Sequence, residues 1–260
     1  MKFKNLLTDK KIAIIQCRMG SNRLPGKVLA DIGGNLSLDI LISRLQKSKL
    51  INKIVLATTL NKEDDILEYF AQAKGISIYR DNADVLKKVC NTADSSKADL
   101  IIDVTGDCPF IDPVEIDKLI LKLYFFDCDY VSNISPRNLP IGFDIQVYKK
   151  DILKKVEAVT FDEAHRTHSG WNILNYERQH IGYSESWDLV IRHNKIIKRF
   201  YHPDWRVVLD YMEDLILLNK IYNHFGHIDF SQWDVMRLLE KNLEWLDINK
   251  NCRQKRPDEV

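Results

Sequence analysis

The chain has 260 residues, of which 45% are hydrophobic and 29% are charged, and its formal net charge at pH 7 is +1. This length suits a domain with a sizeable core, and the near-neutral charge excludes a global attraction to nucleic acid or to an anionic membrane. The lysine-rich start does not resemble a signal peptide, and no apolar run approaches the ~20 residues of a membrane helix, so we expect a cytoplasmic protein.

The first hundred residues alternate between strand patterns and helix patterns. Short β-branched runs predict buried strands, and apolar residues at helical spacing predict helices. In chain order we expect a strand over 11–17, a helix over 36–50, a strand over 53–58, a helix over 63–74 that ends at Gly75, a strand over 76–79, a helix over 84–95 and a strand over 99–104. This alternation predicts an α/β protein with a mostly parallel, Rossmann-like sheet flanked by helices. Ligands of such sheets bind beyond the carboxyl ends of the strands.

The second half of the chain shows a more mixed pattern. We expect strands over 128–133, 143–148 and 206–209, a hairpin with strands over 187–192 and 198–201, and helices over 161–176, 211–224 and 230–246. The polar tail over 249–260 is expected to be frayed and disordered. No linker divides the sequence, so we predict a single domain over 1–260.

The loop after the first predicted strand is the most informative feature of the sequence. Residues 16–29 read QCRMGSNRLPGKVL, and they combine two glycines with a serine and three cations: Gly20, Gly26, Ser21, Arg18, Arg23 and Lys27. Glycine lets backbone N–H groups approach an anion, successive N–H groups form an anion-binding nest, and arginine and lysine add charge-assisted bonds to phosphate. A Walker A motif is excluded, because five residues rather than four separate the glycines and valine follows the lysine. A solvated basic turn is the alternative.

The loop after the strand over 99–104 carries a conspicuous carboxylate. Residues 104–113 read VTGDCPFIDP. An aspartate that follows a glycine at a strand end is well placed to hold a hard cation, and Mg²⁺ prefers a few carboxylates together with substrate phosphates. Asp107 is therefore a candidate metal ligand, with a simple turn aspartate as the alternative. Asp112 precedes Pro113, which is typical of a helix N-cap.

These two loops resemble the signature segments of the cytidylyltransferase family that includes the spore-coat polysaccharide protein SpsF and, more distantly, the CMP-KDO synthetases. The family segments read QARMGS-x-RLPGK and VTGDCPLIDP, and this chain departs from the first at Cys17. The resemblance implies a GT-A-like nucleotide-diphosphosugar transferase fold and Asp107 as a ligand of Mg²⁺. It also implies that a nucleoside triphosphate is bound by Arg18, Met19, Gly20, Ser21, Arg23 and Lys27.

A third segment resembles the family at the other end of the chain. Residues 206–218 read RVVLDYMEDLILL and are similar to the family pattern R-x-T-V-D-T-P-E-D-L, with Tyr-Met in place of Thr-Pro. The resemblance implies that Asp210 is the second Mg²⁺ ligand. An N-cap of the following helix is the alternative role for Asp210, and we expect Asp214 to be structural.

Two further segments imply an acceptor site. Residues 140–148, PIGFDIQVY, resemble P-x-G-x-D-x-E-V and imply Asp144 near the acceptor, with glutamine where the family has glutamate. Residues 161–169, FDEAHRTHS, resemble R-E-H-V-T and imply acceptor contacts by His165 and Arg166. A zinc pair of His165 and His168 is disfavoured, since no third ligand stands at a usual spacing and the five cysteines form no C-x-x-C pair. Residues 80–86, RDNADVL, resemble the substrate-facing segment R-G-S-E-D-D-V-L but are one residue shorter.

The resemblance implies a Mg²⁺-dependent nucleotidyltransferase that moves CMP from CTP to a sugar, sugar-acid or phosphorylated acceptor, releases pyrophosphate and serves surface polysaccharide or glycoconjugate synthesis. Catalysis would depend on Arg18, Lys27, Asp107 and Asp210. Residues about 10–110 would form the nucleotide-binding half and residues about 111–248 the acceptor-binding half.

Several alternatives stay open at this point. They are transfer of GMP or another nucleotide to a sugar phosphate, and a catalytically silent protein that binds nucleotide or sugar. A glycosyltransferase is disfavoured, because the one D-x-D pattern, over 127–129, stands at the entrance of a predicted strand. Nucleic acid and membrane are not expected as partners, whereas the family resemblance is compatible with a homodimer.

Overall fold

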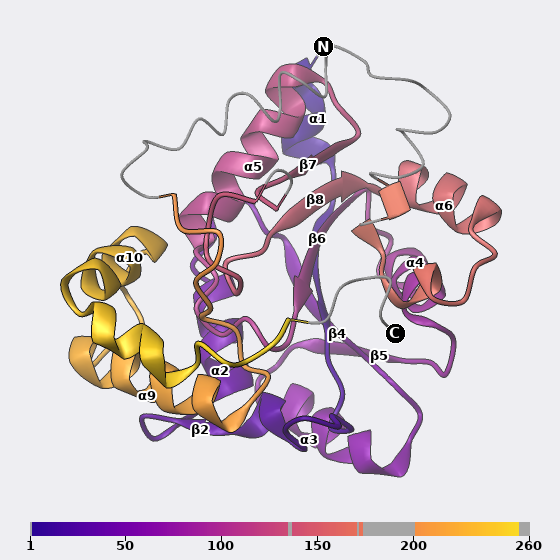
Figure 1. Cartoon of the computed structure of the whole chain (residues 1–260). Helices are drawn as coiled ribbons and strands as arrows, with labels where there is room; N and C mark the ends of the chain where they lie inside the picture. Colours follow the sequence, from indigo (N-terminus) through magenta and orange to yellow (C-terminus); the bar gives the residue numbers. More distant parts are fainter. Residues whose placement is uncertain (1, 135–136, 171, 174–200, 255–260) are drawn as a thin grey trace.

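The computed structural model describes residues 2–134, 137–170, 172–173 and 201–254. A six-stranded sheet with the order β5-β4-β1-β6-β8-β7 forms its centre (Figure 1). The strands are β1 (Lys11–Gln16), β4 (Lys53–Thr58), β5 (Ser77–Arg80), β6 (Leu100–Thr105), β7 (Tyr130–Ser132) and β8 (Gln146–Lys149). The first four strands of the chain in this sheet, β1, β4, β5 and β6, run parallel, while β8 pairs antiparallel with both β6 and β7. The predicted α/β class with a mostly parallel sheet is confirmed.

Helices cover both faces of this sheet. On these faces lie α1 (Lys2–Thr8), α2 (Ser37–Leu45), α3 (Asp65–Ala73), α4 (Val85–Ser95), α5 (Pro113–Phe126) and α6 (Lys150–Val159). The helices α9 (Met212–Phe225) and α10 (Gln232–Lys241) pack beside the sheet in a separate apolar cluster. Short 3₁₀ helices are η1 (Lys27–Leu29), η2 (Lys62–Asp64), η3 (His165–Thr167) and η5 (Leu243–Ile248), and β2 (Asp31–Ile32) forms a small hairpin with β3 (Asn35–Leu36). Across the described ranges, no helix is long and apolar enough to span a bilayer.

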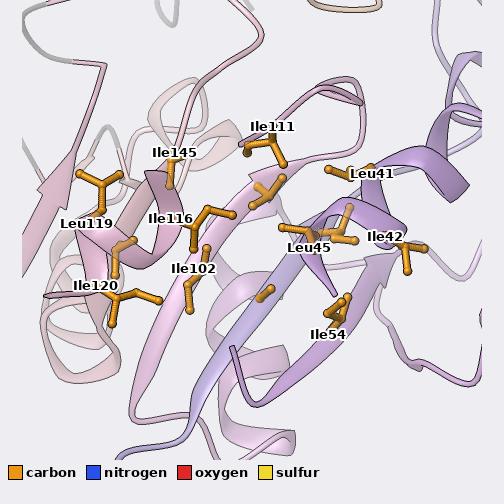
Figure 2. Packing of buried hydrophobic residues seen from close by; sticks show 14 of the residues in the cluster. Leu41, Ile42, Leu45, Ile54, Ile102, Ile111, Ile116, Leu119, Ile120 and Ile145 are labelled. Atoms are coloured by element: carbon orange, nitrogen blue, oxygen red, sulfur yellow. The ribbon is translucent and has the colours of Figure 1, made fainter. Parts of the chain in front are cut away.

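The alternating side chains of β1 divide the core between the two faces, as the pleat of a strand requires. Ala13 and Ile15 pack with the apolar sides of α2, α3 and α5. Figure 2 shows this part of the core, with Leu45 of α2, Ile102 of β6 and Ile116 of α5 among its labelled residues. Ile12 and Ile14 pack on the opposite face with α4 and α6. A strand buried on both faces has a continuous apolar run, which is why the apolar residues 12–15 predicted a buried strand over 11–17.

A third apolar cluster joins α9 and α10 to the rest of the molecule. Arg44 of α2 is buried beside it and donates hydrogen bonds to the carbonyls of Phe110, Ile111, Ile228 and Phe230. Burial lowers the pKa of Arg44 to about 10, so the side chain stays charged at neutral pH. This one guanidinium ties the loop after β6 to the segment before α10, and no sequence pattern predicted that role.

Strand register brings the informative loops together. Gln16 pairs with Ala57 on one side and with Thr105 on the other, so β1, β4 and β6 end at the same edge of the sheet. The loop over 16–29 and the loop over 104–113 therefore leave the sheet side by side. Asp112 caps α5 as predicted, because its side chain accepts a hydrogen bond from Val114 N at 2.9 Å.

Two predicted elements of the second half are wrong in part because side chains replace backbone pairing. The strand expected over 143–148 begins only at Gln146, since the Asn133 side chain bonds Phe143 O and Ile145 N. The first part of the helix expected over 161–176 is a turn followed by η3, because Asp162 accepts from the amides of Ala164 and His165, which is the usual competition of an aspartate with helix formation. Residues 170, 172 and 173 are helical, and residues 171 and 174–176 lie outside the described residues.

Further corrections concern the C-terminal third. The strand expected over 206–209 is a single bridge between Arg206 and Ile141. The helix expected over 230–246 ends at Lys241, because Asn242 has non-helical angles and its side chain bonds Leu238 O; η5 follows. Within the tail expected to be disordered over 249–260, Asn249 is only 3% exposed. The predicted hairpin over 187–201, apart from its last residue, lies outside the described residues, as do residues 255–260.

Candidate active site

The loop after β1 is folded back on itself. Gly26 N donates to Met19 O at 3.0 Å, Lys27 N to Leu24 O at 3.2 Å, and Leu24 N to the hydroxyl of Ser21 at 3.3 Å. Gly26 has φ +71°, a left-handed conformation that favours glycine. The amides of residues 20–23 have no acceptor among the described residues, so they are the N–H groups that an anion could use.

Asp64 holds this loop in place, and the sequence did not reveal it. Its buried carboxylate accepts hydrogen bonds from Met19 N at 2.7 Å, from the Thr58 hydroxyl at 2.9 Å and from the Thr59 hydroxyl and amide. Burial alone would raise the pKa of Asp64, but these hydrogen bonds outweigh it and lower the pKa. In the sequence Asp64 stands among the acidic residues that begin a helix, which hid its contact with a loop 45 residues earlier.

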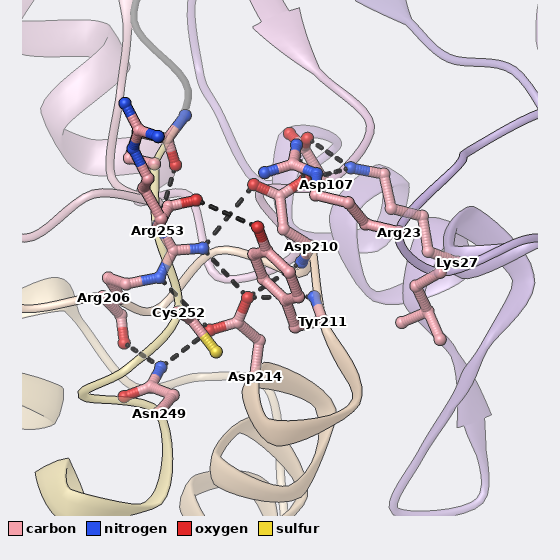
Figure 3. A network of polar contacts seen from close by, with 12 residues as sticks. Arg23, Lys27, Asp107, Arg206, Asp210, Tyr211, Asp214, Asn249, Cys252 and Arg253 are labelled. Atoms are coloured by element: carbon pink, nitrogen blue, oxygen red, sulfur yellow. Dashed lines mark hydrogen bonds and ion pairs between the residues drawn. The ribbon is translucent and has the colours of Figure 1, made fainter.

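Asp107 and Asp210 converge on one ammonium group (Figure 3). Lys27 Nζ lies 2.7 Å from Asp107 Oδ2 and 2.7 Å from Asp210 Oδ1. Arg23 Nη2 lies 2.7 Å from the same Asp210 oxygen, and its guanidinium lies over the ring of Tyr211. Two cations of the first loop and the two predicted metal ligands therefore form one charged cluster, which we call the carboxylate cluster.

Backbone contacts hold the two carboxylate segments together. Leu209 N donates to Asp107 O at 2.8 Å, so the residue before Asp210 is bonded directly to the loop after β6. Gly106 allows the β1 and β6 loops to approach, because a Cβ there would lie 2.7 Å from the Cβ of Cys17. A substitution of Gly106 would push the two halves of the carboxylate cluster apart.

The pKa shifts in this cluster describe a mutually stabilised ion pair. Burial would lower the pKa of Lys27, but the charges of Asp107 and Asp210 and their hydrogen bonds outweigh it and raise the pKa. Burial would likewise raise the pKa of Asp107, and the nearby Lys27 charge outweighs it and lowers the pKa. Both groups are therefore charged at neutral pH.

Arg18 lies apart from this cluster. Among the described residues no acceptor pairs with its guanidinium. Burial lowers the pKa of Lys88 on α4, and the positive charge of Arg18 lowers it further. Arg18 and Lys88 are therefore close enough to repel, while the charges of Asp81, Asp64 and Asp84 act on the pKa of Lys88 in the opposite sense.

The structure separates the roles of Asp210 and Asp214. The N-cap role considered for Asp210 is wrong, because its carboxylate faces Lys27 and Arg23, and α9 begins after Tyr211. Asp214 Oδ2 instead accepts from the amides of Asp210 and Tyr211, both at 3.1 Å. Asp214 is structural, as the sequence predicted.

The predicted acceptor residues are held by local partners. Asp144 forms a two-point pair with Arg137, with distances of 2.6 and 2.7 Å. Asp107 and Asp144 both act on the Cys108 thiol, whose pKa is raised first by burial and then by these two charges, so Asp144 lies near the carboxylate cluster.

Arg166 connects two segments that the sequence assigned to the substrate side. It lies 2.9 Å from Asp84, in the segment RDNADVL, and 2.8 Å from Glu157 of α6. The neighbouring His165 begins η3, and its amide bonds Asp162. Among the described residues, the ion pairs of Arg166 do not include a member of the carboxylate cluster. The acceptor role of His165 and Arg166 stays a prediction.

The site combines a cation-rich loop with two converging carboxylates at the carboxyl edge of a parallel sheet. This arrangement is typical of α/β proteins that bind phosphate groups. The comparison with known families makes this specific: the model of the family described as cytidylyltransferase matches residues 12–225. The chain belongs to the cytidylyltransferase family.

Individual relatives agree with this membership. The chain is 30% identical to the spore coat polysaccharide biosynthesis protein SpsF of Bacillus subtilis over 88% of its own length and 93% of the relative. It is 31% identical to an uncharacterised protein of Methanocaldococcus jannaschii over 96% of its length and 99% of the relative. Among solved structures, a cytidylyltransferase from Leptospira borgpetersenii superposes with a TM-score of 0.79 at 26% identity, over 95% of this chain and all of that one.

Proposed function

We propose that this protein transfers CMP from CTP to a sugar-type acceptor and releases pyrophosphate. The observation that carries the proposal is the convergence of Asp107 and Asp210 on Lys27, with Arg23 in the same cluster. Family membership supports CTP as the donor. Similarity to a protein named for spore coat polysaccharide biosynthesis supports a sugar, sugar acid or phosphorylated sugar as the acceptor, and a role in surface polysaccharide or glycoconjugate synthesis.

The chemistry of the carboxylate cluster fits Mg²⁺. Across the described part of the chain, no group of three or more histidine, cysteine or acidic side chains gathers as a metal site. Asp107 and Asp210 nevertheless match the ligand preference of Mg²⁺, because both carboxylates face the same ammonium group of Lys27. Mg²⁺ binds one or two carboxylates and completes its coordination shell with water and substrate phosphates. Asp107 and Asp210 would hold the ion, which would neutralise charge that develops at the α-phosphate.

The residues of the loop would hold the triphosphate. Arg18, Arg23 and Lys27 would supply charge, and the amides of residues 20–23, which have no acceptor among the described residues, would supply N–H donors. The acceptor oxygen attacks the α-phosphorus in line, a new oxygen–phosphorus bond forms, and the bond to the β-phosphate breaks to release pyrophosphate. Catalysis of this kind depends mainly on positioning and electrostatic stabilisation.

The acceptor decides whether a base is needed. A phosphate acceptor is already anionic, whereas a hydroxyl must lose a proton to a neighbouring group. Both oxygens of Asp144 are engaged by Arg137, so we assign Asp144 to acceptor binding and propose His165 as the proton acceptor for a hydroxyl. Arg166 would orient the segment that carries His165.

Nucleotide-dependent thermal stability tests the proposal. A ligand that binds only the folded state raises the melting temperature by mass action. We expect CTP with Mg²⁺ to raise it more than GTP, UTP, ATP or dTTP, and the effect to be lost in Lys27→Ala. Stabilisation by GTP alone would mean that GTP, not CTP, is the nucleotide donor. No change in melting temperature with any nucleotide would favour a binding protein without catalytic activity. Pyrophosphate release with sugar, sugar-acid and sugar-phosphate acceptors then identifies the acceptor.

A further inference from the structure

The C-terminal segment, residues 249–254, packs behind the carboxylate cluster. It follows η5 and lies beyond residues 12–225, the part of the chain that the family model matches. Its first residue, Asn249, is 3% exposed. Figure 3 shows Asn249 and Arg253 beside Arg206, Tyr211 and Asp214, on the side of Asp210 away from Lys27.

Four hydrogen bonds join this segment to the residues around Asp210. Asn249 Nδ2 donates to Asp214 Oδ1 at 2.8 Å and to Arg206 O at 3.3 Å. Arg206 Nη1 donates to Gln254 Oε1 at 2.8 Å. The hydroxyl of Tyr211 donates to Arg253 O at 3.2 Å.

The same residues fix Asp210 directly. Arg206 Nη2 lies 3.0 Å from Asp214 Oδ2 and 3.6 Å from Asp210 Oδ2. Asp214 Oδ2 also accepts from the amide of Asp210. The backbone of Asp210 is therefore held by Asp214. Of the two carboxylate oxygens of Asp210, Oδ2 faces Arg206, and Oδ1 faces Lys27 and Arg23.

Asn249 supplies the short hydrogen bond to Asp214 Oδ1. The other contact of this oxygen, from Arg206 Nε, is 3.4 Å long. Asp214 is fully buried, and a buried carboxylate oxygen that loses its donor must move or remain unsatisfied. A movement of Asp214 would be transmitted to Asp210 through the shared amide contact and through Arg206.

We propose that Asn249 is a positioning residue for Asp210, and that the C-terminal segment thereby completes the metal side of the site. The proposal rests on the function proposed above, because it requires Asp210 to hold the metal. Residues that orient metal ligands from behind typically change metal affinity by about 10- to 100-fold when they are removed.

The test compares Asn249→Ala with Asn251→Ala, an exposed asparagine of the same segment. Mn²⁺ binding in the presence of saturating CTP is measured by titration calorimetry, and the Mg²⁺ concentration that gives half-maximal turnover is measured in parallel. We expect Asn249→Ala to weaken Mn²⁺ binding by about 10-fold, to raise the Mg²⁺ requirement by the same factor, and to recover most of its kcat at high Mg²⁺. Asn251→Ala should match the wild type in both measurements.

A second variant protects the test against a folding defect. Gln254→Ala removes only the exposed acceptor of Arg206 Nη1 and should raise the Mg²⁺ requirement by about 2- to 3-fold, a smaller share of the same effect. Unchanged Mn²⁺ affinity in Asn249→Ala would overturn the positioning role of Asn249 while the proposed function stands. Should that variant not fold, unchanged Mn²⁺ affinity in Gln254→Ala would overturn the part of the C-terminal segment in completing the metal side of the site. A wild-type protein that neither binds Mn²⁺ with CTP nor releases pyrophosphate would overturn both.

Discussion

The proposed nucleotide end and the proposed acceptor end of the site hold their charges in different ways. At the nucleotide end, Lys27 bridges Asp107 and Asp210, and Arg23 shares the second carboxylate, so one cluster joins residues from three distant parts of the chain. At the acceptor end, Asp144 pairs with Arg137, seven residues earlier, and Arg166 pairs with Asp84 and Glu157. These acceptor-end pairs share no residue with each other or with the carboxylate cluster.

The difference indicates which changes should be tolerated. A charge removed from the cluster unbalances the mostly buried opposite charges that remain, which is costly. A charge removed from a separate, partly exposed pair costs little stability and can alter one substrate without affecting the other. The cluster should therefore behave as a unit, and the acceptor residues should behave independently.

Replacement of a cluster carboxylate should have the largest effect. Asp107→Asn keeps the shape of the side chain but removes a charge, and we expect kcat to fall by at least about 100-fold, as for the loss of one electrostatic contact to a transition state. Pyrophosphate release with CTP and acceptor measures it. Asp129→Asn, in an exposed pair with Lys149, is the matched control. An Asp107→Asn enzyme with more than a tenth of normal activity would exclude a metal ligand at this position.

Asp144→Asn should affect the acceptor alone. The loss of one charge from the two-point pair with Arg137 should raise the KM for the acceptor by about 10-fold, the scale of one hydrogen bond to a charged group. The KM for CTP and the stabilisation by CTP should stay as in the wild type. A weaker response to CTP instead would mean that the two ends of the site are coupled.

The stability of the cluster should depend on pH at both extremes. The pKa of Lys27 is raised in the folded state, so its contribution is complete below its ordinary value of about 10.4 and is lost as pH rises through the folded pKa. The pKa of Asp107 is lowered, so its contribution is complete above about 3.9 and is lost as pH falls through the folded pKa. We expect Lys27→Met to melt about 5 °C below the wild type at pH 7.

That difference in melting temperature between the wild type and Lys27→Met should shrink below pH 4 and above pH 10. Thermal unfolding of the two metal-free proteins across this range measures it. A difference that stays constant from pH 3 to pH 7 would argue that the ion pair with Asp107 does not stabilise the fold.

Arg166→Met should have the smallest effect on stability. Its partners Asp84 and Glu157 are partly exposed, so we expect a loss of at most about 1 kcal/mol, or roughly 2–4 °C in melting temperature. The KM for the acceptor should rise about threefold if the pair orients His165, an effect smaller than a full hydrogen bond. Lys154→Met, which breaks an exposed pair with Asp94, is the control, and an unchanged KM for the acceptor would leave Arg166 with a structural role only.

Local sequence patterns served the first half of the chain better than the second. The central strands and helices up to residue 105 are buried on one or both sides, so their apolar periodicity is regular. In the second half, the side chains of Asn133, Asp162 and Asn242 bond the backbone and end or prevent the expected elements. Such competition depends on which backbone groups are nearby, and spacing along the chain does not reveal it.

The sequence by itself determined the α/β class and the two strand-end loops, together with the candidate ligands Asp107 and Asp210, because motif residues and periodicity are local properties of the chain. Only the tertiary structure decided that both carboxylates meet at Lys27, that Asp64 holds the first loop, and that Asn249 lies behind Asp210. These contacts join residues 35 to 183 positions apart. They depend on strand register and on how separate helices pack, which no single segment encodes.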